Sequence, residues 1–458
     1  MTGDREAGSA VWGGGPAIAL ATSLAGRAAA SPLVRGGLTL IAGVLAGNLL
    51  GFGRVAVTAY LLGTHSRADS LAVAVGPTDT LNSVFINSVI FAFVPMLTAC
   101  QGRDRAALFL KLSRYFLWVS AGITLAVVIL APWLMRLLAP GLDLNYFGTS
   151  VNVLRILALS VMSAGTGAVQ CALLYTDRRF APTAFYQAAL NLFTIVGALA
   201  LWRWLGVYAF AVGYTAGAWA QLAIVWFAAR SGLEASPSGS VAMHWGEVLA
   251  KPVFYVVYAA ALGVNIIFTR AYATHAGPGM AAALDYCMRG VGVPMALLVN
   301  PISNSLLPEI ARLRSLLRLR DAFRLIDRTV ALTAALAAGG CAFAIAFRQP
   351  AIALFFQRGS FTAESTRLVS AVFLGLGPSL LGWSLIEICA RSLFALDRRW
   401  PAVVAAVVPV LLNVLITLRL GPYRPELIGL GSSVGLAVGF AVLFVTMHAR
   451  RSRWMTEN

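Results

Sequence analysis

The stretch RLRSLLRLRDAFRLIDRTVALTAALAAGGCAFAIAF, residues 312–347, joins a strongly basic segment to a long apolar one. Six arginines lie between 312 and 328, and the apolar part runs over 326–347. An apolar run of about 20 residues can cross a ~30 Å hydrocarbon core as a helix. Arginines beside such a run mark the cytoplasmic side of a membrane. The stretch therefore predicts a transmembrane helix that begins in the cytoplasm.

The same apolar pattern recurs along the whole chain. Twelve stretches have it: 37–62, 70–100, 108–138, 150–176, 181–202, 206–229, 245–274, 279–308, 326–347, 366–394, 401–420 and 427–449. Most of them exceed the length needed for one crossing, so several helices should tilt or extend past the bilayer.

Basic residues gather in every second connection between these stretches. They are Arg27 and Arg35; Arg103, Arg105, Lys111 and Arg114; Arg178 and Arg179; the segment from Arg230 to Lys251; the six arginines of 312–328; Arg398 and Arg399; and Arg450, Arg451 and Arg453. The other connections carry few charges. The positive-inside rule therefore predicts that both termini are cytoplasmic, in agreement with an even number of helices.

Composition excludes a soluble globular chain. The sequence is 59% hydrophobic and 12% charged, with a mean hydropathy of +0.79. We attribute the net charge of +17 to arginines that set the topology and face anionic lipids, not to nucleic-acid binding. The five cysteines have neither metal-ligand nor CxxC spacing, so no metal site is predicted.

The polar segment 231–245 divides the chain into two equal sets of helices. The prediction is an all-α polytopic membrane protein with about twelve transmembrane helices, in two six-helix pseudo-symmetric lobes around a central cavity. The expected parts are a cytoplasmic tail (1–35), an N-lobe (36–230), a cytoplasmic linker (231–245), a C-lobe (246–450) and a second tail (451–458).

Small residues recur on one face of the first predicted helix. Gly43, Gly47 and Gly51 are four residues apart, a spacing that lets another helix approach closely. Either a sliding surface between moving helices or ordinary tight packing would use such a face.

Several charged residues lie within the apolar stretches. A charge at a helix centre costs roughly 2.5–3.5 kcal/mol on the insertion scale, so such a residue should face water, a partner or a substrate. The candidates are Arg54, Asp79, Arg270, Asp285, Arg289, Glu387 and Arg391. Asp69 is expected to cap the start of the second helix and is a further cavity or gating charge.

The arginines come from equivalent helices of both halves. A cavity with guanidinium groups from both sides suits a phosphate-bearing substrate, because guanidinium binds phosphate bidentately. We favour substrate binding for Arg54 and Arg289, and ion pairing for Asp79 with Arg270. Arg270 is also a third candidate for binding the diphosphate in the cavity. Asp285 and Arg289 are also spaced for pairing at i,i+4, and Glu387 and Arg391 are expected to form a local pair.

Seven motifs, in order, resemble the MurJ/MviN family of lipid II flippases in the multidrug/oligosaccharidyl-lipid/polysaccharide exporter superfamily. They are LLGFGRVAVTAYLLGTHSRADSLAVA (49–74), FAFVPML (91–97), LLYTDRRFAPTAFYQAALNL (173–192), YAFAVGYTAGAWAQL (208–222), DYCMRGVGVPMALLVNPISNSLLPEIARL (285–313), LFFQRGSFTAEST (354–366) and ARSLFALDRRWP (390–401). The resemblance covers about residues 35–450.

The resemblance implies a flippase of the bacterial inner membrane and not an enzyme. It would carry a polyprenyl-diphosphate-linked sugar to the outer leaflet by alternating access. In that family, arginines of the cavity act on the diphosphate, and Arg54 and Arg289 match two of them. Asp69 matches a family residue at the start of the second helix. The implied partners are the glycolipid, anionic lipids and proteins of cell-envelope synthesis.

The sequence also departs from the family pattern at positions near the expected cavity. Asn48 and Val55 replace an Arg and an Asp, the second helix lacks its basic residue near Leu81 and Asn82 and its acidic–Gly pair near Ile86–Asn87, and an acidic residue is missing near Gly292. Family members often have fourteen helices, against the twelve expected here. Another polyprenyl-linked glycan, such as an exopolysaccharide unit, therefore stays open as the cargo.

Three further classes remain as alternatives. An ion-coupled drug antiporter of the same superfamily would want an acidic cavity, and a membrane glycosyltransferase would want acid/base groups in a sizeable outer loop. A non-transporting scaffold is the third. The sequence has no GxxxxGK[ST] motif, so transport would be driven by an ion gradient, the membrane potential or consumption of the product, without a cofactor.

Overall fold

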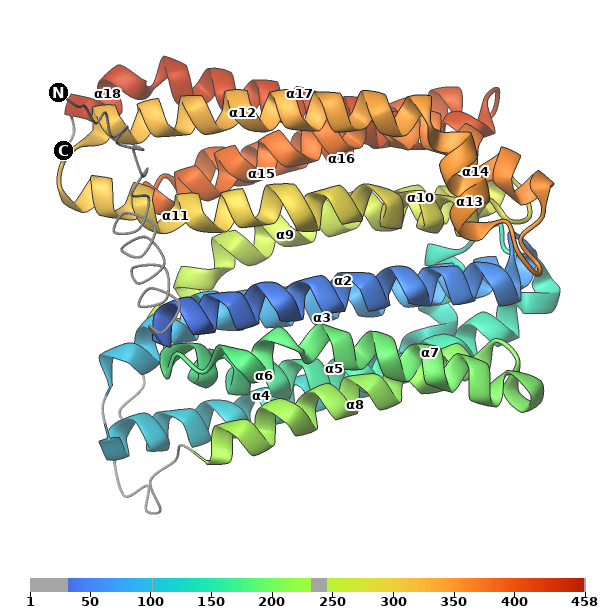
Figure 1. Ribbon diagram of the computed structural model, residues 1–458, viewed down its shortest axis with the longest axis horizontal. Helices are drawn as coiled ribbons and strands as arrows, with labels where there is room; N and C mark the ends of the chain where they lie inside the picture. Colours follow the sequence, from blue (N-terminus) through green and yellow to red (C-terminus); the bar gives the residue numbers. More distant parts are fainter. Residues whose placement is uncertain (1–31, 101, 232–244, 457–458) are drawn as a thin grey trace, which may run out of the picture.

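The computed structural model describes residues 32–100, 102–231 and 245–456 as a bundle of long helices (Figure 1). The elements are α2 (Pro32–Leu62), α3 (Ser66–Ala99), α4 (Gly102–Leu138), α5 (Leu144–Thr176), α6 (Phe180–Ala184), α7 (Tyr186–Leu205), α8 (Tyr208–Arg230), α9 (Trp245–Ala273), η1 (Thr274–Ala276), α10 (Met280–Pro294), η2 (Met295–Val299), α11 (Asn300–Ser315), α12 (Leu319–Ala346), α13 (Arg348–Phe356), α14 (Ala363–Leu376), α15 (Ser379–Ala395), α16 (Arg399–Leu420), η3 (Pro425–Leu427), α17 (Gly429–Ala449) and α18 (Arg451–Thr456).

Each of the twelve apolar stretches coincides with one helix or with consecutive helices, which confirms the all-α membrane fold. Ten helices of the described chain are long and apolar enough to cross a membrane, and the bent pair α14–α15 makes an eleventh span. The polar residues of α3, among them Asp79, Asn82 and Ser83, lower its hydropathy. The number twelve therefore stays a prediction.

Two predicted spans contain interruptions that the hydropathy pattern does not reveal. The chain turns by 42° between α14 and α15, where Gly377 and Pro378 separate the helices. A five-residue π-helix, η2, follows Pro294 between α10 and α11. Proline removes a backbone donor and clashes with the preceding turn, so it favours such breaks.

The helices pack as two sets, which lie in the lower and the upper half of Figure 1. In the first set, α5 packs against α3, α4 and α8, and α7 packs against α2 and α8. In the second, α17 packs against α14, α15 and α16, and α9 packs against α16. The sets correspond to the expected lobes, whose boundaries stay a prediction. Residues 1–31 of the expected tail and 232–244 of the linker lie outside the described chain.

Glycines of α2 fix this helix against α6 and α7. A Cβ on Gly43 would lie 2.5 Å from the backbone of Ala184, and the amide of Asn191 donates a hydrogen bond to the Gly47 carbonyl at 2.9 Å. The small face is therefore a tight packing surface within the first set. It sets the rotation of α2, and with it the direction of Arg54.

Buried amides and hydroxyls fix α9 in the second set. Asn265 of α9 donates to Ser432 of α17 at 2.9 Å, and Asn413 of α16 donates to Thr269 at 2.8 Å. Hydrogen bonds of this kind join helices in a membrane, where apolar burial between helices contributes little. They hold the turn of α9 that carries Arg270, the residue after Thr269.

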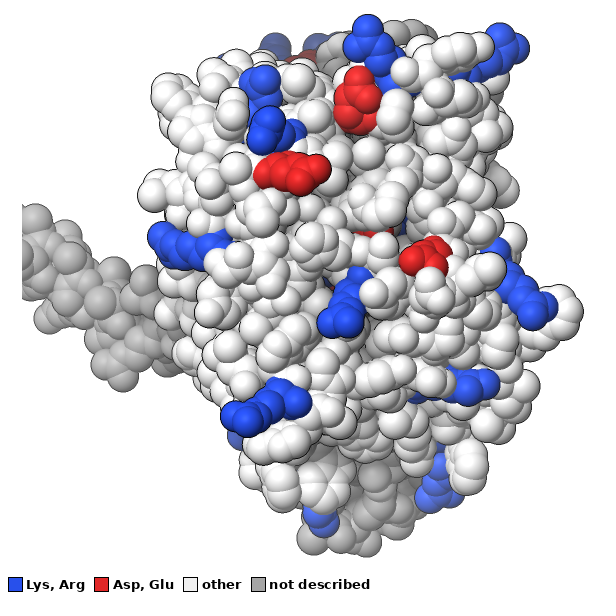
Figure 2. Space-filling view, turned by 90° about the vertical axis from the view of Figure 1, so that its right-hand side faces the viewer, with Lys and Arg blue, Asp and Glu red and all other residues white. Residues whose placement is uncertain are grey.

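We call one end of the bundle the basic end: it carries α18, the start of α2 and the α11–α12 connection, at the left of Figure 1. We call the other end, with the loops around 63–65, 139–143, 274–279 and 357–362, the closed end. Figure 2 looks onto the closed end, which is covered largely by uncharged side chains with scattered charges.

Hydrogen bonds to backbone carbonyls join the two sets at the closed end. The Ser360 amide donates to the Tyr60 carbonyl at 2.8 Å, and the Tyr286 hydroxyl donates to the Gly63 carbonyl at 2.8 Å. Gly63 and Gly359 have φ of +58° and +61°, and a Cβ on either would lie within 2.6 Å of atoms of the other set. Only glycine allows so close an approach with this backbone conformation.

Candidate functional site

A cavity of about 650 Å³ lies between the two sets of helices. Residues of α2, α3 and α7 line one side, and residues of α9, α10 and α15 line the other. Six of the eight charged residues singled out from the sequence line it: Arg54, Asp79, Arg270, Arg289, Glu387 and Arg391. Asp285 lines a smaller adjoining pocket of about 50 Å³, together with Arg54 and Arg289. The structure therefore brings seven of the eight together.

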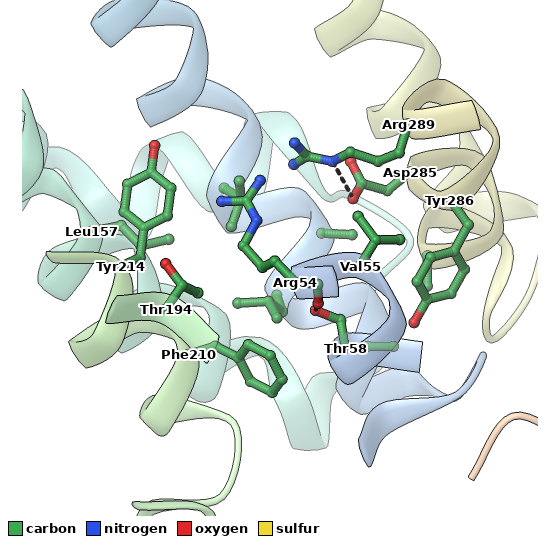
Figure 3. A pocket seen from close by; sticks show the side chains of 15 residues that line it. Arg54, Val55, Thr58, Leu157, Thr194, Phe210, Tyr214, Asp285, Tyr286 and Arg289 are labelled. Carbon is green, nitrogen blue, oxygen red and sulfur yellow. Dashed lines mark hydrogen bonds and ion pairs between the residues drawn. The ribbon is translucent and has the colours of Figure 1, made fainter. Parts of the chain in front are cut away.

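Arg54 and Arg289 approach each other from opposite sets. Arg54 is on α2, Arg289 is on α10, and both line both pockets. Their guanidinium groups point into the space between the helices (Figure 3). The Arg54 guanidinium lies over the ring of Tyr214, 5.7 Å from its centroid. Two guanidinium groups that face one space can hold one anion between them.

Arg289 lies between two carboxylates. Its Nη2 is 3.4 Å from Oδ2 of Asp79 on α3, and its Nε is 3.5 Å from Oδ2 of Asp285, four residues earlier on α10. Asp285 also accepts a hydrogen bond from Arg270 of α9. The predicted pairing of Asp79 with Arg270 is therefore wrong. The rotation of α9 directs Arg270 to α10, and Asp79 bonds to Arg289 instead.

Tyr214 and Asn82 complete this group of residues, and sequence reasoning missed them as site residues. The Tyr214 hydroxyl of α8 donates to Oδ1 of Asp79 at 2.6 Å. Asn82 donates to the Tyr214 oxygen at 3.4 Å and to Ser160 at 3.1 Å. Polar groups inside apolar helices were the only available signal. We call Arg54, Asp79, Tyr214, Arg270, Asp285 and Arg289 the deep cluster.

A second charged group lies nearer the basic end. Arg391 Nε is 2.6 Å from Oε1 of Glu387, which confirms the predicted i,i+4 pair on α15. The Tyr258 hydroxyl of α9 donates to Glu387 at 3.4 Å. Tyr258 precedes Arg270 by twelve residues on α9, which corresponds to about 18 Å along a helix axis. The cavity thus extends from the deep cluster toward the basic end.

Asp69 lies outside the cavity, at the closed end. Its carboxylate accepts hydrogen bonds from the backbone amides of Gly279 at 2.6 Å and Ala282 at 2.8 Å. It therefore caps the start of α10, in the other set, whereas the sequence predicted that it caps the start of its own helix. A carboxylate at a helix N-terminus satisfies otherwise unpaired amides and favours the helix dipole.

Arg270→Ala should lower stability more than Asp79→Ala. The side chain of Arg270 is only 10% exposed, whereas that of Asp79 is 31% exposed to the cavity. Loss of the Arg270 guanidinium leaves the Asp285 carboxylate with one cation fewer, at a cost of about 2 kcal/mol. Thermal unfolding in detergent should show this, with Arg424→Ala, from an exposed pair with Glu426, as the control. Equal melting temperatures for the Arg270 and Arg424 variants would contradict the assignment.

Two sets of membrane helices around a charged cavity, joined at one end, define a polytopic transporter. The model of the family described as Lipid II flippase MurJ matches residues 58–458, so the chain belongs to the lipid II flippase MurJ family.

Individual relatives agree with this assignment. A probable lipid II flippase MurJ of Rhizobium meliloti (strain 1021) is 28% identical over 409 residues, which cover 85% of this chain and 76% of the relative. The solved structure of lipid II flippase MurJ in an inward closed conformation has a TM-score of 0.77 at 18% identity, and the match covers 90% of this chain and 87% of that one. An inward-facing multidrug resistance MATE family transporter has a TM-score of 0.75 at 12% identity, with 92% and 99% covered. The fold is thus common to both kinds of transporter.

Proposed function

We propose that this protein flips a polyprenyl-diphosphate-linked sugar precursor, lipid II or a related lipid-linked oligosaccharide, from the inner to the outer leaflet by alternating access. The observation that carries the proposal is the convergence of Arg54 and Arg289, from opposite sets of helices, on one cavity. A diphosphate held between them would bind both sets at once. The protein would be a transporter and not an enzyme.

The cavity charge supports an anionic headgroup over a cationic drug. Four arginines and three carboxylates line the two pockets: Arg54, Arg270, Arg289 and Arg391, with Asp79, Asp285 and Glu387. Guanidinium groups match phosphate oxygens in pairs, and the low-dielectric surroundings strengthen these bonds. A drug antiporter would instead need an excess of carboxylates facing the cavity.

The orientation follows from the arginine pattern. The basic end would face the cytoplasm, with both termini, and its arginines would contact anionic lipids of the inner leaflet. The closed end would then face the outside of a bacterial inner membrane. The structure would represent the state in which the cavity is shielded from the outside and reached from the cytoplasm.

Cysteine labelling tests this topology. In a cysteine-free background, single cysteines at Asp143 and Ser360 should react with an impermeant maleimide added to intact spheroplasts. Cysteines at Arg179 and Arg320 should react only after the membrane is opened, because they lie at the basic end. Labelling at the Asp143 position from the cytoplasmic side alone would overturn the orientation.

The proposed cargo is tested in a strain depleted of its own lipid II flippase. Expression of this chain should restore growth and the delivery of lipid II to the outer leaflet, whereas an Arg54→Ala chain made at the same level should not. Failure of the unaltered, correctly inserted chain would exclude lipid II and favour another polyprenyl-linked glycan. Cell-envelope synthesis proteins that use the glycan would then be its partners.

A further inference from the structure

Building on the proposed function, we propose that Asp79 is an internal counter-ion that occupies, at Arg289, the place that the substrate diphosphate takes. In the empty protein, the Asp79 carboxylate neutralises one of the two binding guanidinium groups. The substrate must displace it to bind. Asp79 thereby sets the affinity and ties the two sets of helices together between transport events.

The position of the ion pair supports exchange with a substrate. Asp79 is on α3 of the first set and Arg289 is on α10 of the second, and their Oδ2 and Nη2 atoms are 3.4 Å apart. Both side chains are 31% exposed, and both line the large cavity. An anion that enters the cavity can therefore reach this pair. The Arg270–Asp285 pair, at 10% and 19% exposure, is much less accessible.

The surroundings of Asp79 let it give up Arg289 at low cost. Tyr214 donates to Oδ1 at 2.6 Å, whereas Arg289 approaches Oδ2. When Arg289 turns to a diphosphate, Oδ1 keeps its hydrogen bond and Oδ2 faces the cavity. A carboxylate that keeps one strong partner and gains water is not left buried and unpaired. Asn82 in turn fixes the Tyr214 oxygen, at 3.4 Å.

Asp285 cannot serve this purpose, although it also contacts Arg289. It is four residues away on the same helix, so it moves with Arg289 in any rearrangement of the two sets. It also binds Arg270. Asp285 therefore orients Arg289, and Asp79 alone of the two carboxylates joins Arg289 across the cavity.

An internal counter-ion has a consequence for the transport cycle. The empty protein keeps an ion pair between its sets, and this pair adds to the contact with Asp285 in neutralising Arg289. The substrate exchanges one bridge between the sets, Asp79–Arg289, for another through its diphosphate. Binding is weaker than two free arginines would allow, and release of the cargo is easier.

Binding of a sugar-free diphosphate lipid tests the proposal. Farnesyl diphosphate should bind the full chain in nanodiscs, and Asp79→Asn should lower its Kd about tenfold, because one competing charge-assisted bond is lost. Farnesol lacks the diphosphate, so its Kd should not change. Asp397→Asn, which removes a carboxylate from an exposed pair with Arg314 at 3.6 Å, is the matched control and should change neither Kd.

The outcomes separate this proposal from the proposed function. An unchanged or higher Kd of farnesyl diphosphate for Asp79→Asn, with normal binding by the unaltered chain, would overturn the counter-ion role alone. No binding of farnesyl diphosphate by either chain would overturn the diphosphate site itself. If Asp79→Asn is not recovered folded, Tyr214→Phe provides the second variant. This variant removes the hydrogen bond from the Tyr214 hydroxyl to the Asp79 carboxylate. The carboxylate should then bind Arg289 more tightly, and the Kd of farnesyl diphosphate should rise.

Discussion

Arg54→Ala and Arg289→Ala will each abolish transport of the polyprenyl-diphosphate glycolipid while the protein still folds and inserts. Each variant removes one of the two guanidinium groups that face the same cavity from opposite sets of helices. Loss of a bidentate charge-assisted contact of about 3 kcal/mol corresponds to roughly a hundredfold weaker diphosphate binding. Initial rates of flipping in proteoliposomes measure the effect.

Lysine variants and a surface arginine provide the controls for this prediction. Arg54→Lys and Arg289→Lys should restore only part of the rate, because lysine supplies a point charge without the planar fork. Arg312→Ala removes an arginine from an exposed pair with Glu309 at 2.6 Å and should leave transport unchanged. Full activity of the Arg54→Ala, Arg289→Ala double variant would remove the diphosphate clamp and leave the fold assignment intact.

Gly63→Ala and Gly359→Ala will shift the protein toward a state in which the two sets of helices are separated at the closed end. A Cβ on Gly63 would lie 2.2 Å from the Ser360 carbonyl oxygen, and one on Gly359 would lie 2.6 Å from the Tyr60 carbonyl oxygen. Neither contact can be relieved without separating the two sets of helices there. Alternating access requires that both end states be accessible, so each variant should also slow transport.

Distances between spin labels at Arg67 and Glu364, exposed residues of opposite sets at the closed end, measure this shift. The glycine variants should gain a population at longer distance. Gly206→Ala is a matched control: its φ is +54°, but a Cβ there meets nothing within 4 Å. Its φ is positive as well, so alanine there also strains the backbone, but without a contact between the sets. An identical change in the Gly206 variant would show that strain alone moves the label distance.

The positions of the helices could be predicted because a membrane imposes a simple code. Long apolar runs such as 326–347 form helices, because lipid cannot satisfy unpaired backbone groups. Charged residues within the apolar runs, such as Arg54 and Arg289, line the cavity, because a charge in contact with lipid is costly. Spacing on one helix also predicted the Glu387–Arg391 pair, because residues four apart are neighbours on a helix surface.

Partners on different helices could not be predicted in this way. Arg270 pairs with Asp285 and not with Asp79 because of the rotation of α9. Hydrogen bonds of Asn265 and Thr269 to partners on α17 and α16 fix this rotation. Nothing in the sequence distinguishes Tyr214 from the other tyrosines of the apolar stretches. The close approach at Gly63 and Gly359 likewise depends on backbone conformation and packing that the periodicity of the apolar runs does not encode.

The most direct test of the central claim is the flipping of fluorescent lipid II, with a matched exopolysaccharide-type polyprenyl diphosphate, in proteoliposomes that contain the purified chain. A membrane-impermeant quencher added outside reports the label that reaches the outer leaflet. We expect the unaltered chain to expose inner-leaflet label of at least one of the two lipids, and the Arg54→Ala, Arg289→Ala double variant to expose none beyond protein-free vesicles. Equal exposure by the double variant, or no exposure of either lipid by the correctly inserted unaltered chain, would contradict transport of a diphosphate lipid through this cavity.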